Sequence, residues 1–322
     1  MSLVDALALV KRLLILGCML GVMWLGVWIA PAFGQERPAP ARPKIGLVLS
    51  GGGAMGMAHV GAIQTLEKLG IRPDLVVGTS MGSIVGGLYA SGMSGNELEH
   101  AIETMDWDLI FDTSPPREGL TYREKQLQAA FPVKASVGLA GTRLRRPDAL
   151  ISDANLVLEL RRLVRVRAAV PTFDDLPIPF RAVATDIETG KKVVLDRGEL
   201  AGAMRASMSV PGVFAPYSLD GKLLVDGGMS DNVPIDVARE MGADVVIVVA
   251  TQTPLLPADQ LRSLGGILGQ TVTMLILANE RQQLATLKPG DVLISVNTGE
   301  LSSTDFKRGA EFIAIGKAAS EK

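Results

Sequence analysis

Several residue types are scarce in this chain of 322 residues, and each shortage excludes a class of site or partner. Cys18 is the only cysteine, so neither a disulfide framework nor a zinc site built from cysteines can form. Lysine and arginine (32) do not outnumber aspartate and glutamate (34), so we expect no nucleic-acid partner. His59 and His100 are the only histidines, which limits the catalytic mechanisms available to the chain.

The first part of the chain has the pattern of a targeting segment. Lys11 and Arg12 precede residues 13–29, which contain no charged residue, and small residues and a proline-rich stretch follow. This order predicts a signal peptide or N-terminal anchor over residues 1–34 and a linker over 35–43. An uncleaved anchor stays open, because the apolar run has about the minimum length of a bilayer span. We therefore expect an exported protein that is periplasmic or membrane-associated, or secreted.

The remainder, residues 44–322, alternates between strand and helix patterns, which predicts one α/β domain. Short apolar runs bounded by turn residues predict a mainly parallel central sheet with right-handed crossovers. The expected strands cover residues 45–50, 75–77, 180–186, 191–195, 223–225, 245–249 and 292–295. The expected helices cover residues 58–69, 81–91, 96–105, 199–208, 234–241, 264–287 and 305–319.

A first candidate motif is Gly78-x-Ser80-x-Gly82, at the end of a predicted strand. A nucleophilic serine needs a tight strand-to-helix turn that exposes its hydroxyl, and flanking glycines let such a turn close without a clashing Cβ. An ordinary glycine-rich turn has the same pattern, so this motif is weak alone. It gains weight from the motifs that accompany it.

A second motif, residues 51–56 (GGGAMG), lies between the first strand and its helix. Consecutive glycines let backbone N–H groups converge on an anion, which in acyl transfer would form an oxyanion hole. The spacing of Gly51, Gly53 and Gly56 also fits a dinucleotide-binding loop. That alternative is disfavoured because the acidic residue nearby, Asp74, precedes the second strand instead of following it.

A third motif, Asp226-Gly227-Gly228, follows an apolar strand, where a carboxylate could serve as a base; an Asp-Gly turn is the simpler alternative. A buried carboxylate can replace the usual histidine if its proton affinity is raised. Asp186 and Asp231 are the other candidates. A conventional triad would have to use His59, which we expect to brace the glycine loop or bond a backbone carbonyl instead.

These residues resemble the patatin-like phospholipase family, in its bacterial and exported form. The resemblance rests on residues 46–64 (GLVLSGGGAMGMAHVGAIQ), 78–82 (GTSMG), 184–190 (ATDIETG), 205–216 (RASMSVPGVFAP) and 226–234 (DGGMSDNVP). It implies a three-layer α/β/α sandwich and a serine acyl hydrolase, that is, a carboxylic ester hydrolase acting on phospholipids, lysophospholipids or neutral lipids. A membrane surface is then an expected partner, and no metal or organic cofactor is implied.

The same resemblance assigns roles to particular residues. Ser80 is expected to be the nucleophile and Asp226 the base of a Ser–Asp dyad. The oxyanion hole is expected from the amides of four residues of the glycine loop, Gly51, Gly52, Gly53 and Ala54. The glycines that support these motifs are Gly56, Gly78, Gly82, Gly227 and Gly228.

One difference from the family pattern leaves a second function open. The family commonly has arginine or lysine at the position of Met55, so a catalytically weak or silent lipid-binding protein of the same fold is the alternative. An arginine-rich segment, residues 143–167, is expected either to contact anionic headgroups or to be a solvated helical face. Ser207 and Ser209 lie in a segment expected to support the site.

Overall fold

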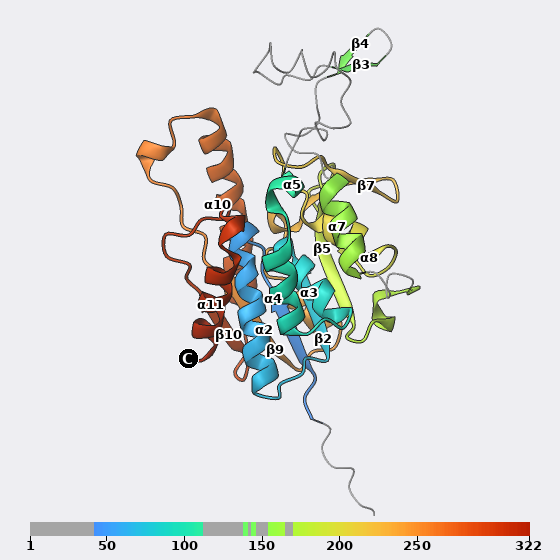
Figure 1. The fold of residues 1–322 in the computed structure, drawn as a ribbon, viewed down its shortest axis with the longest axis vertical. Helices are drawn as coiled ribbons and strands as arrows, with labels where there is room; N and C mark the ends of the chain where they lie inside the picture. Colours follow the sequence, from blue (N-terminus) through green and yellow to red (C-terminus); the bar gives the residue numbers. More distant parts are fainter. Residues whose placement is uncertain (1–41, 112–137, 141–142, 146–153, 165–169) are drawn as a thin grey trace, which may run out of the picture. The chain divides into compact units, whose positions relative to one another are not determined.

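The computed structural model describes residues 42–111, 138–140, 143–145, 154–164 and 170–322. It divides the chain into Met1–Arg42 and a compact unit, Pro43–Lys322, which contains all the described elements (Figure 1). The predicted leader, residues 1–34, lies outside the described residues and stays a prediction. None of the described helices combines the length and the apolar character that a bilayer span needs.

The main sheet has eight strands and is mixed. In spatial order its strands are β10 (Val292–Val296), β9 (Val245–Thr251), β1 (Ile45–Leu49), β2 (Leu75–Thr79), β5 (Phe180–Asp186), β8 (Lys222–Asp226) and β7 (Tyr217–Leu219), with β6 (Lys192–Leu195) also paired to β5. The pairs from β10 to β5 are parallel, as expected. Beyond β5 the pairs are antiparallel, which the sequence patterns did not predict for β8.

Helices lie on both faces of this sheet (Figure 1). They are α2 (Ala58–Lys68), α3 (Met81–Ala90), α4 (Gly95–Thr104), α5 (Trp107–Phe111), α7 (Ala154–Val164), α8 (Leu200–Ser207), α9 (Ile235–Glu240), α10 (Leu264–Leu284) and α11 (Gly309–Ser320). Short 3₁₀ helices are η1 (Gly53–Met57), η2 (Phe173–Asp175), η3 (Gly227–Met229), η4 (Ala258–Gln260) and η5 (Phe306–Arg308). A separate hairpin joins β3 (Gly138–Ala140) to β4 (Arg143–Arg145).

Two hydrophobic cores cover the two faces of the sheet. Successive strand residues point to opposite faces, and accordingly Leu47 and Leu49 of β1 belong to the core beneath α2, α3, α4, α8 and α11. Val48, between them, belongs to the core beneath α9. The three-layer α/β/α arrangement implied by the resemblance is therefore confirmed.

Helices α2 and α11 approach closely enough that their backbones meet. A Cβ on Gly61 of α2 would lie 2.0 Å from the carbonyl oxygen of Ile313, and a Cβ on Gly316 of α11 would lie 1.9 Å from that of Ala58. Neither carbonyl can retreat without disturbing its own helix. The two glycines therefore fix how closely α11 covers the helix that follows the glycine loop.

This close approach generates a stability prediction. The substitution Gly316→Ala should lower the free energy of unfolding by about 1–3 kcal/mol, because the added methyl overpacks a backbone contact. The matched control is Gly269→Ala in α10, where a Cβ meets no atom within 4 Å and helix propensity alone should add about 0.5–1 kcal/mol. Urea unfolding followed by circular dichroism measures both. Equal effects of the two substitutions would contradict the packing account.

Candidate active site

Ser80 occupies a strained turn between β2 and α3. Its backbone has φ 54° and ψ −124°, a conformation that residues other than glycine rarely adopt. A Cβ on Gly78 would lie 2.3 Å from the carbonyl oxygen of Gly82, and a Cβ on Gly82 would lie 2.4 Å from those of Leu49 and Ser50. Both flanking glycines are therefore required sterically for this turn, as the motif predicted.

Hydrogen bonds hold the turn in this conformation. The Ser80 N–H donates to Ser207 Oγ at 2.9 Å, and the Ser207 hydroxyl donates in turn to the carbonyl oxygen of Val183. Ser83 Oγ donates to the Ser80 carbonyl at 2.7 Å. Ser207 thus supports the turn from the end of α8, and its hydroxyl both accepts one hydrogen bond and donates another.

Asp226 lies in hydrogen-bond contact with Ser80. Strand register explains why, since Thr79 pairs with Val183 of β5 and the next β5 residue, Ala184, pairs with Asp226 of β8. Ser80 Oγ donates to Asp226 Oδ2 at 2.6 Å, a short distance typical of a hydroxyl bound to a carboxylate. Because β8 runs antiparallel to β5, its last residue lies beside the turn that follows β2.

The surroundings of Asp226 raise its proton affinity. The side chain is buried, and this burial raises its pKa to about 6, against the opposing hydrogen bonds from Ser80 and from the Gly228 N–H to Oδ1 at 2.8 Å. A carboxylate of this kind is still mainly ionised at neutral pH but accepts a proton more readily than an exposed aspartate. It therefore has the properties that a general base needs.

The other two candidate aspartates are committed to other contacts. Asp186 is part of the β5–β6 turn, where Oδ1 accepts from the Glu188 N–H at 3.0 Å and Oδ2 from Thr189 Oγ1 at 2.9 Å. Asp231 accepts from Lys192 Nζ at 2.8 Å. The structure gives neither carboxylate a hydrogen bond to Ser80, so the choice of Asp226 over both agrees with the geometry.

His59 braces the glycine loop, as predicted. It is fully buried in α2, and its Nε2 lies 2.8 Å from the carbonyl oxygen of Ser50, the residue before the loop. Burial lowers its pKa to about 4 despite that bond, so the ring is neutral and Nε2 is the donor. His100 is exposed on α4. The structure gives neither ring a hydrogen bond to Ser80, and a conventional triad has no support.

The glycine loop requires a correction to the predicted oxyanion hole. The Gly51 N–H donates to Asn232 Oδ1 at 3.1 Å, and the Ala54 N–H donates to the Ser303 carbonyl at 2.8 Å. These two amides are therefore engaged, because side chains and loops distant in the sequence reach them. Among the described residues, no acceptor contacts the N–H groups of Gly52 and Gly53, so only these two stay available to an anion.

The shape of the loop explains its run of glycines. Gly53 has φ 57°, and a Cβ there would lie 2.4 Å from the Ser303 carbonyl oxygen. Gly56 packs against Met81, the residue after Ser80, at a would-be Cβ distance of 2.7 Å. Met55, the position at which the resemblance led us to expect a cation, is buried in the core.

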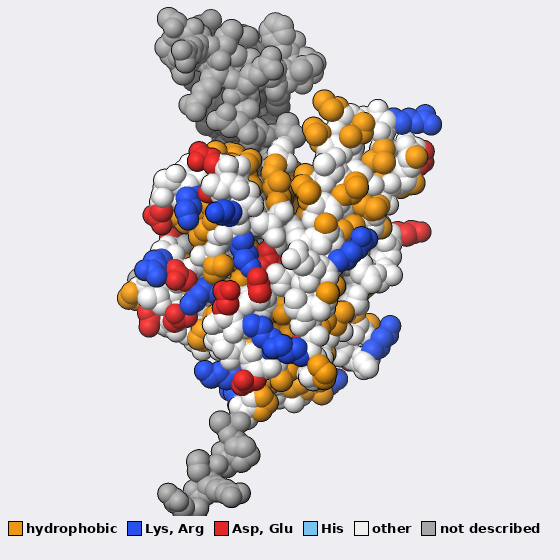
Figure 2. Space-filling model, turned by 180° about the vertical axis from the view of Figure 1, so that it is seen from behind, with side chains coloured by type: hydrophobic (Ala, Val, Ile, Leu, Met, Phe, Trp, Pro, Cys, Tyr) orange, Lys and Arg blue, Asp and Glu red, His pale blue; other side chains and the backbone are white. Residues whose placement is uncertain are grey.

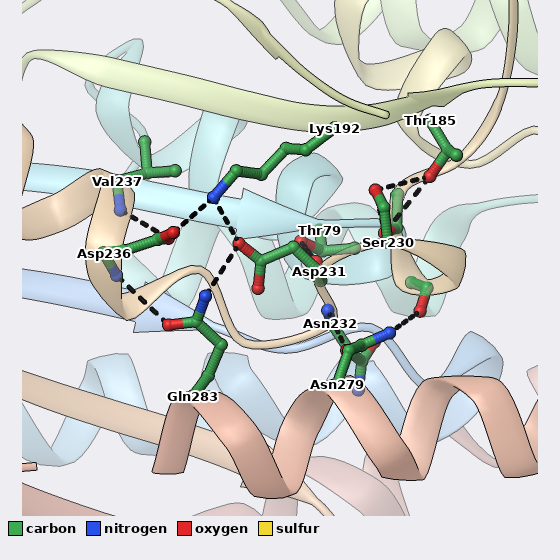
Figure 3. Close-up of polar contacts among 12 residues, drawn as sticks. Thr79, Thr185, Lys192, Ser230, Asp231, Asn232, Asp236, Val237, Asn279 and Gln283 are labelled. Atoms are coloured by element: carbon green, nitrogen blue, oxygen red, sulfur yellow. Dashed lines mark hydrogen bonds and ion pairs between the residues drawn. The ribbon is translucent and has the colours of Figure 1, made fainter. Parts of the chain in front are cut away.

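A polar network joins α10 to the loop that follows Asp226 (Figure 3). Asn279 Nδ2 donates to the Gly228 carbonyl at 2.7 Å, and Asn279 Oδ1 accepts from the Asn232 N–H at 2.8 Å. Asn232 Nδ2 also donates to Glu280 Oε2 at 3.0 Å. Asn232 therefore connects α10 to the Gly51 amide, a role that sequence reasoning missed because its partners come from two distant segments.

The same network contains an ion cluster in which Asp231 is buried and Lys192 and Asp236 are partly exposed. Lys192 Nζ lies 2.8 Å from Asp231 Oδ2 and 2.5 Å from Asp236 Oδ2. Burial raises the pKa of Asp231 to about 7 against the attraction of Lys192. Gln283 Nε2 donates to the same Asp231 oxygen at 3.3 Å, so this cluster anchors the C-terminal part of α10 beside the site.

A narrow apolar cavity begins beside the serine turn. It lies among α3, α4, α7 and the end of α8, and the side chains that line it are all nonpolar, Met81, Ala101, Leu160 and Met208 among them. Met81 and Met208 directly follow Ser80 and Ser207, which are themselves hydrogen-bonded, so the cavity and the site are neighbours. Its volume is about 20 Å³, close to that of a single water, so its apolar lining side chains are nearly in contact.

Other predicted binding features are only partly described. Among the described residues no cluster of histidine, cysteine, aspartate and glutamate could hold a metal ion. Most of the arginine-rich segment lies outside the described residues. In its described helix, α7, Arg161 pairs with Glu199 and Arg162 with Glu159, and both arginines are exposed, as expected of a solvated helical face.

Comparison with known proteins identifies the family. The model of the patatin-like phospholipase family matches residues 47–239, a range that contains Ser80 and Asp226. This chain is 36% identical to an uncharacterized NTE family protein of Mycobacterium tuberculosis over 223 residues, which cover 69% of this chain and 52% of that protein. The chain belongs to the patatin-like phospholipase family.

Two further similarities extend this result. Human patatin-like phospholipase domain-containing protein 6 is 33% identical over 207 residues, 64% of this chain and 13% of that protein. The crystal structure of VipD from Legionella pneumophila is similar in fold, with a TM-score of 0.50 at 18% identity over 87% of this chain and 65% of that one. The chain spans about half the length of the mycobacterial relative, so the activity of the whole protein is a separate question.

Proposed function

We propose that this protein is a serine acyl hydrolase that cleaves lipid esters with a Ser80–Asp226 dyad. The observation that carries the proposal is the 2.6 Å hydrogen bond from Ser80 Oγ to a buried carboxylate whose pKa is raised to about 6. Membership of a family of lipid hydrolases supports the same conclusion. Phospholipids, lysophospholipids and neutral lipid esters are all compatible substrates.

The proposed reaction has two halves. Asp226 accepts the proton of Ser80 as Oγ attacks the ester carbonyl carbon, and the N–H groups of Gly52 and Gly53 stabilise the negative charge on the carbonyl oxygen. The leaving alcohol takes the proton back from Asp226. Water, deprotonated by the same carboxylate, then attacks the acyl-serine, and the fatty acid leaves as Ser80 regains its proton.

Lipid surfaces and export belong to this proposal as well. A lipid ester substrate resides in membranes or lipid droplets, so a membrane surface is the natural partner. The uncharged run 13–29 after Lys11 and Arg12 supports export across the inner membrane. Whether residues 1–34 then remain as an anchor is decided by mass spectrometry of the mature N-terminus.

A second candidate is a weak or silent lipid-binding protein. The observations that favour it are the buried Met55 in place of a cation and the engagement of the Gly51 and Ala54 amides, which leaves two donors for an oxyanion. The two candidates differ in one chemical property. Only an enzyme has a serine that reacts as a nucleophile.

Labelling with a fluorophosphonate probe tests that property. We expect one adduct, on the peptide that contains Ser80, in mass spectra of the digested protein. Ser80→Ala should remove the adduct, and Asp226→Asn should slow labelling by about 10²–10⁴-fold because the base is lost. The control Ser218→Ala changes an exposed serine of β7 and should label normally. A folded wild-type protein that resists the probe would favour the silent candidate.

The apolar cavity predicts a dependence on acyl length. Ala101 lines the cavity from α4, and a long acyl chain can enter only if the lining side chains move apart, so the larger side chain of Ala101→Phe should oppose that opening and exclude long chains. We expect kcat/KM for a p-nitrophenyl palmitate to fall at least about tenfold relative to that for the butyrate. Because both esters are measured on one protein sample, partial unfolding cancels in the ratio. The control is Ala314→Phe on the exposed side of α11, and an unchanged ratio in Ala101→Phe would show that acyl chains bind elsewhere.

A further inference from the structure

An exposed apolar arm extends from the active-site end of the domain. We use the term apolar arm for the loop 252–263 and residues 264–277 of α10. Seven of its large hydrophobic side chains are between 42% and 74% exposed, and they are Leu255, Leu256, Leu264, Ile267, Leu268, Met274 and Leu275. Hydrophobic side chains gather there on the surface, at the upper right in Figure 2. α10 has 21 residues, and none of them is buried.

These side chains form one stripe along the helix. Leu264, Ile267, Leu268, Met274 and Leu275 follow the spacing of three, four and seven residues that places side chains on one face. No charged residue occurs between Arg262 and Glu280. The described residues of the domain do not bury this stripe. An exposed, uncharged apolar face of this length indicates a binding surface.

Polar contacts attach the helix to its own loop and, farther along, to the domain. Gln270 fixes the loop against α10, because its side chain accepts from the Leu256 N–H at 3.1 Å and donates to the Leu256 carbonyl at 3.4 Å. Farther along, Asn279 bonds Gly228 and the loop after Asp226. The stripe is therefore held in place by polar contacts and does not need its own apolar contacts to keep its position.

The arm also begins at the carboxyl ends of the parallel strands, where the site lies. The loop 252–263 leaves the carboxyl end of β9, where Thr251 Oγ1 donates to the Gly51 carbonyl at 2.7 Å. Ser80 follows the carboxyl end of β2, which is parallel to β9 through β1. Both ends of the arm are thus connected to the loops that surround Ser80 and Asp226 (Figure 1).

The composition of the stripe distinguishes between two occupants. An interface with a second copy of this chain would place polar and charged residues around its apolar centre. A lipid surface needs no shape complementarity and accepts an apolar helix face lying in its plane. The absence of charge between Arg262 and Glu280 suits the acyl region of a bilayer instead of an ionic contact.

We propose that the apolar arm inserts its Leu264–Leu275 face into the lipid surface and thereby holds the active site against it. The inference extends the proposed lipid hydrolase function by naming the element that binds the aggregated substrate. It predicts that the arm binds the lipid surface and that the site alone hydrolyses the ester. Loss of the arm contact should impair action on vesicles and leave soluble esters unaffected.

The test places a polarity-sensitive label on the arm of the chain of 322 residues. Ser80→Ala prevents hydrolysis, Cys18→Ser removes the native thiol, and Leu264→Cys carries a nitrobenzoxadiazole label. Addition of phosphatidylcholine vesicles should raise the emission at least about twofold and shift it to the blue, and doxyl-labelled lipid should quench it. The label reports the arm itself, so binding through residues 13–29 does not produce the signal.

A matched control uses Leu69→Cys, labelled in the same background. Leu69 is 64% exposed, close to the 74% of Leu264, and it ends α2 at the opposite edge of the sheet. Its emission should not change with vesicles. The double substitution Ile267→Asp and Leu268→Asp, added to the labelled Leu264→Cys protein, should abolish the vesicle response. The same double substitution in a protein that keeps Ser80 should leave hydrolysis of p-nitrophenyl butyrate within about twofold of the wild-type rate.

Three results would overturn the inference. The first is a Leu264→Cys label that stays in a water-like environment with vesicles present. The second is an equal response at Leu69→Cys. The third is an emission increase that follows protein concentration without lipid, which would make the stripe an interface between copies of the chain. Because the binding assay uses Ser80→Ala protein, its outcome is independent of whether Ser80 is the nucleophile.

Discussion

The hydrogen bond between Ser80 and Asp226 is the contact on which the site depends. It joins residues that are 146 positions apart, since Ser80 follows β2, Asp226 ends β8, and β5 lies between these strands. A buried carboxylate is costly unless it is hydrogen-bonded, and here Ser80 and the Gly228 amide supply the bonds. The bonds are too few to cancel the effect of burial, so the pKa of Asp226 stays raised to about 6. Burial thus gives this carboxylate a higher proton affinity than an exposed aspartate has.

Close backbone approach is the second constraint, and it accounts for the glycines. At Gly78, Gly82 and Gly53 a Cβ would come within 2.4 Å of a carbonyl oxygen. Each close approach has a consequence for the site, because the first two close the turn that carries Ser80 and the third shapes the loop that faces it. The same principle recurs at Gly61 and Gly316, where α11 is held against α2.

Much of this arrangement could be predicted from the sequence, because it depends on local patterns. Strand β1, the glycine loop and the turn at Ser80 are encoded in consecutive residues, and the bracing role of His59 followed from its place in the first turn of α2. The antiparallel direction of β8 was missed, since an apolar strand has the same composition in either direction. Engagement of the Gly51 and Ala54 amides was also missed. Their partners, Asn232 and Ser303, are 181 and about 250 positions away along the chain, and no local pattern records such contacts.

The catalytic roles remain proposals, and their central claim is that Asp226, with its raised pKa, is the base. The most direct test is the pH dependence of kcat/KM for a soluble ester. Because the carboxylate must be deprotonated to accept the serine proton, the rate should rise with pH and reach half its plateau near pH 6. In Asp226→Asn the residual rate should lose this inflection. A half-maximal rate near pH 4, the pKa of the buried His59 ring, or an unchanged profile in Asp226→Asn would contradict the account.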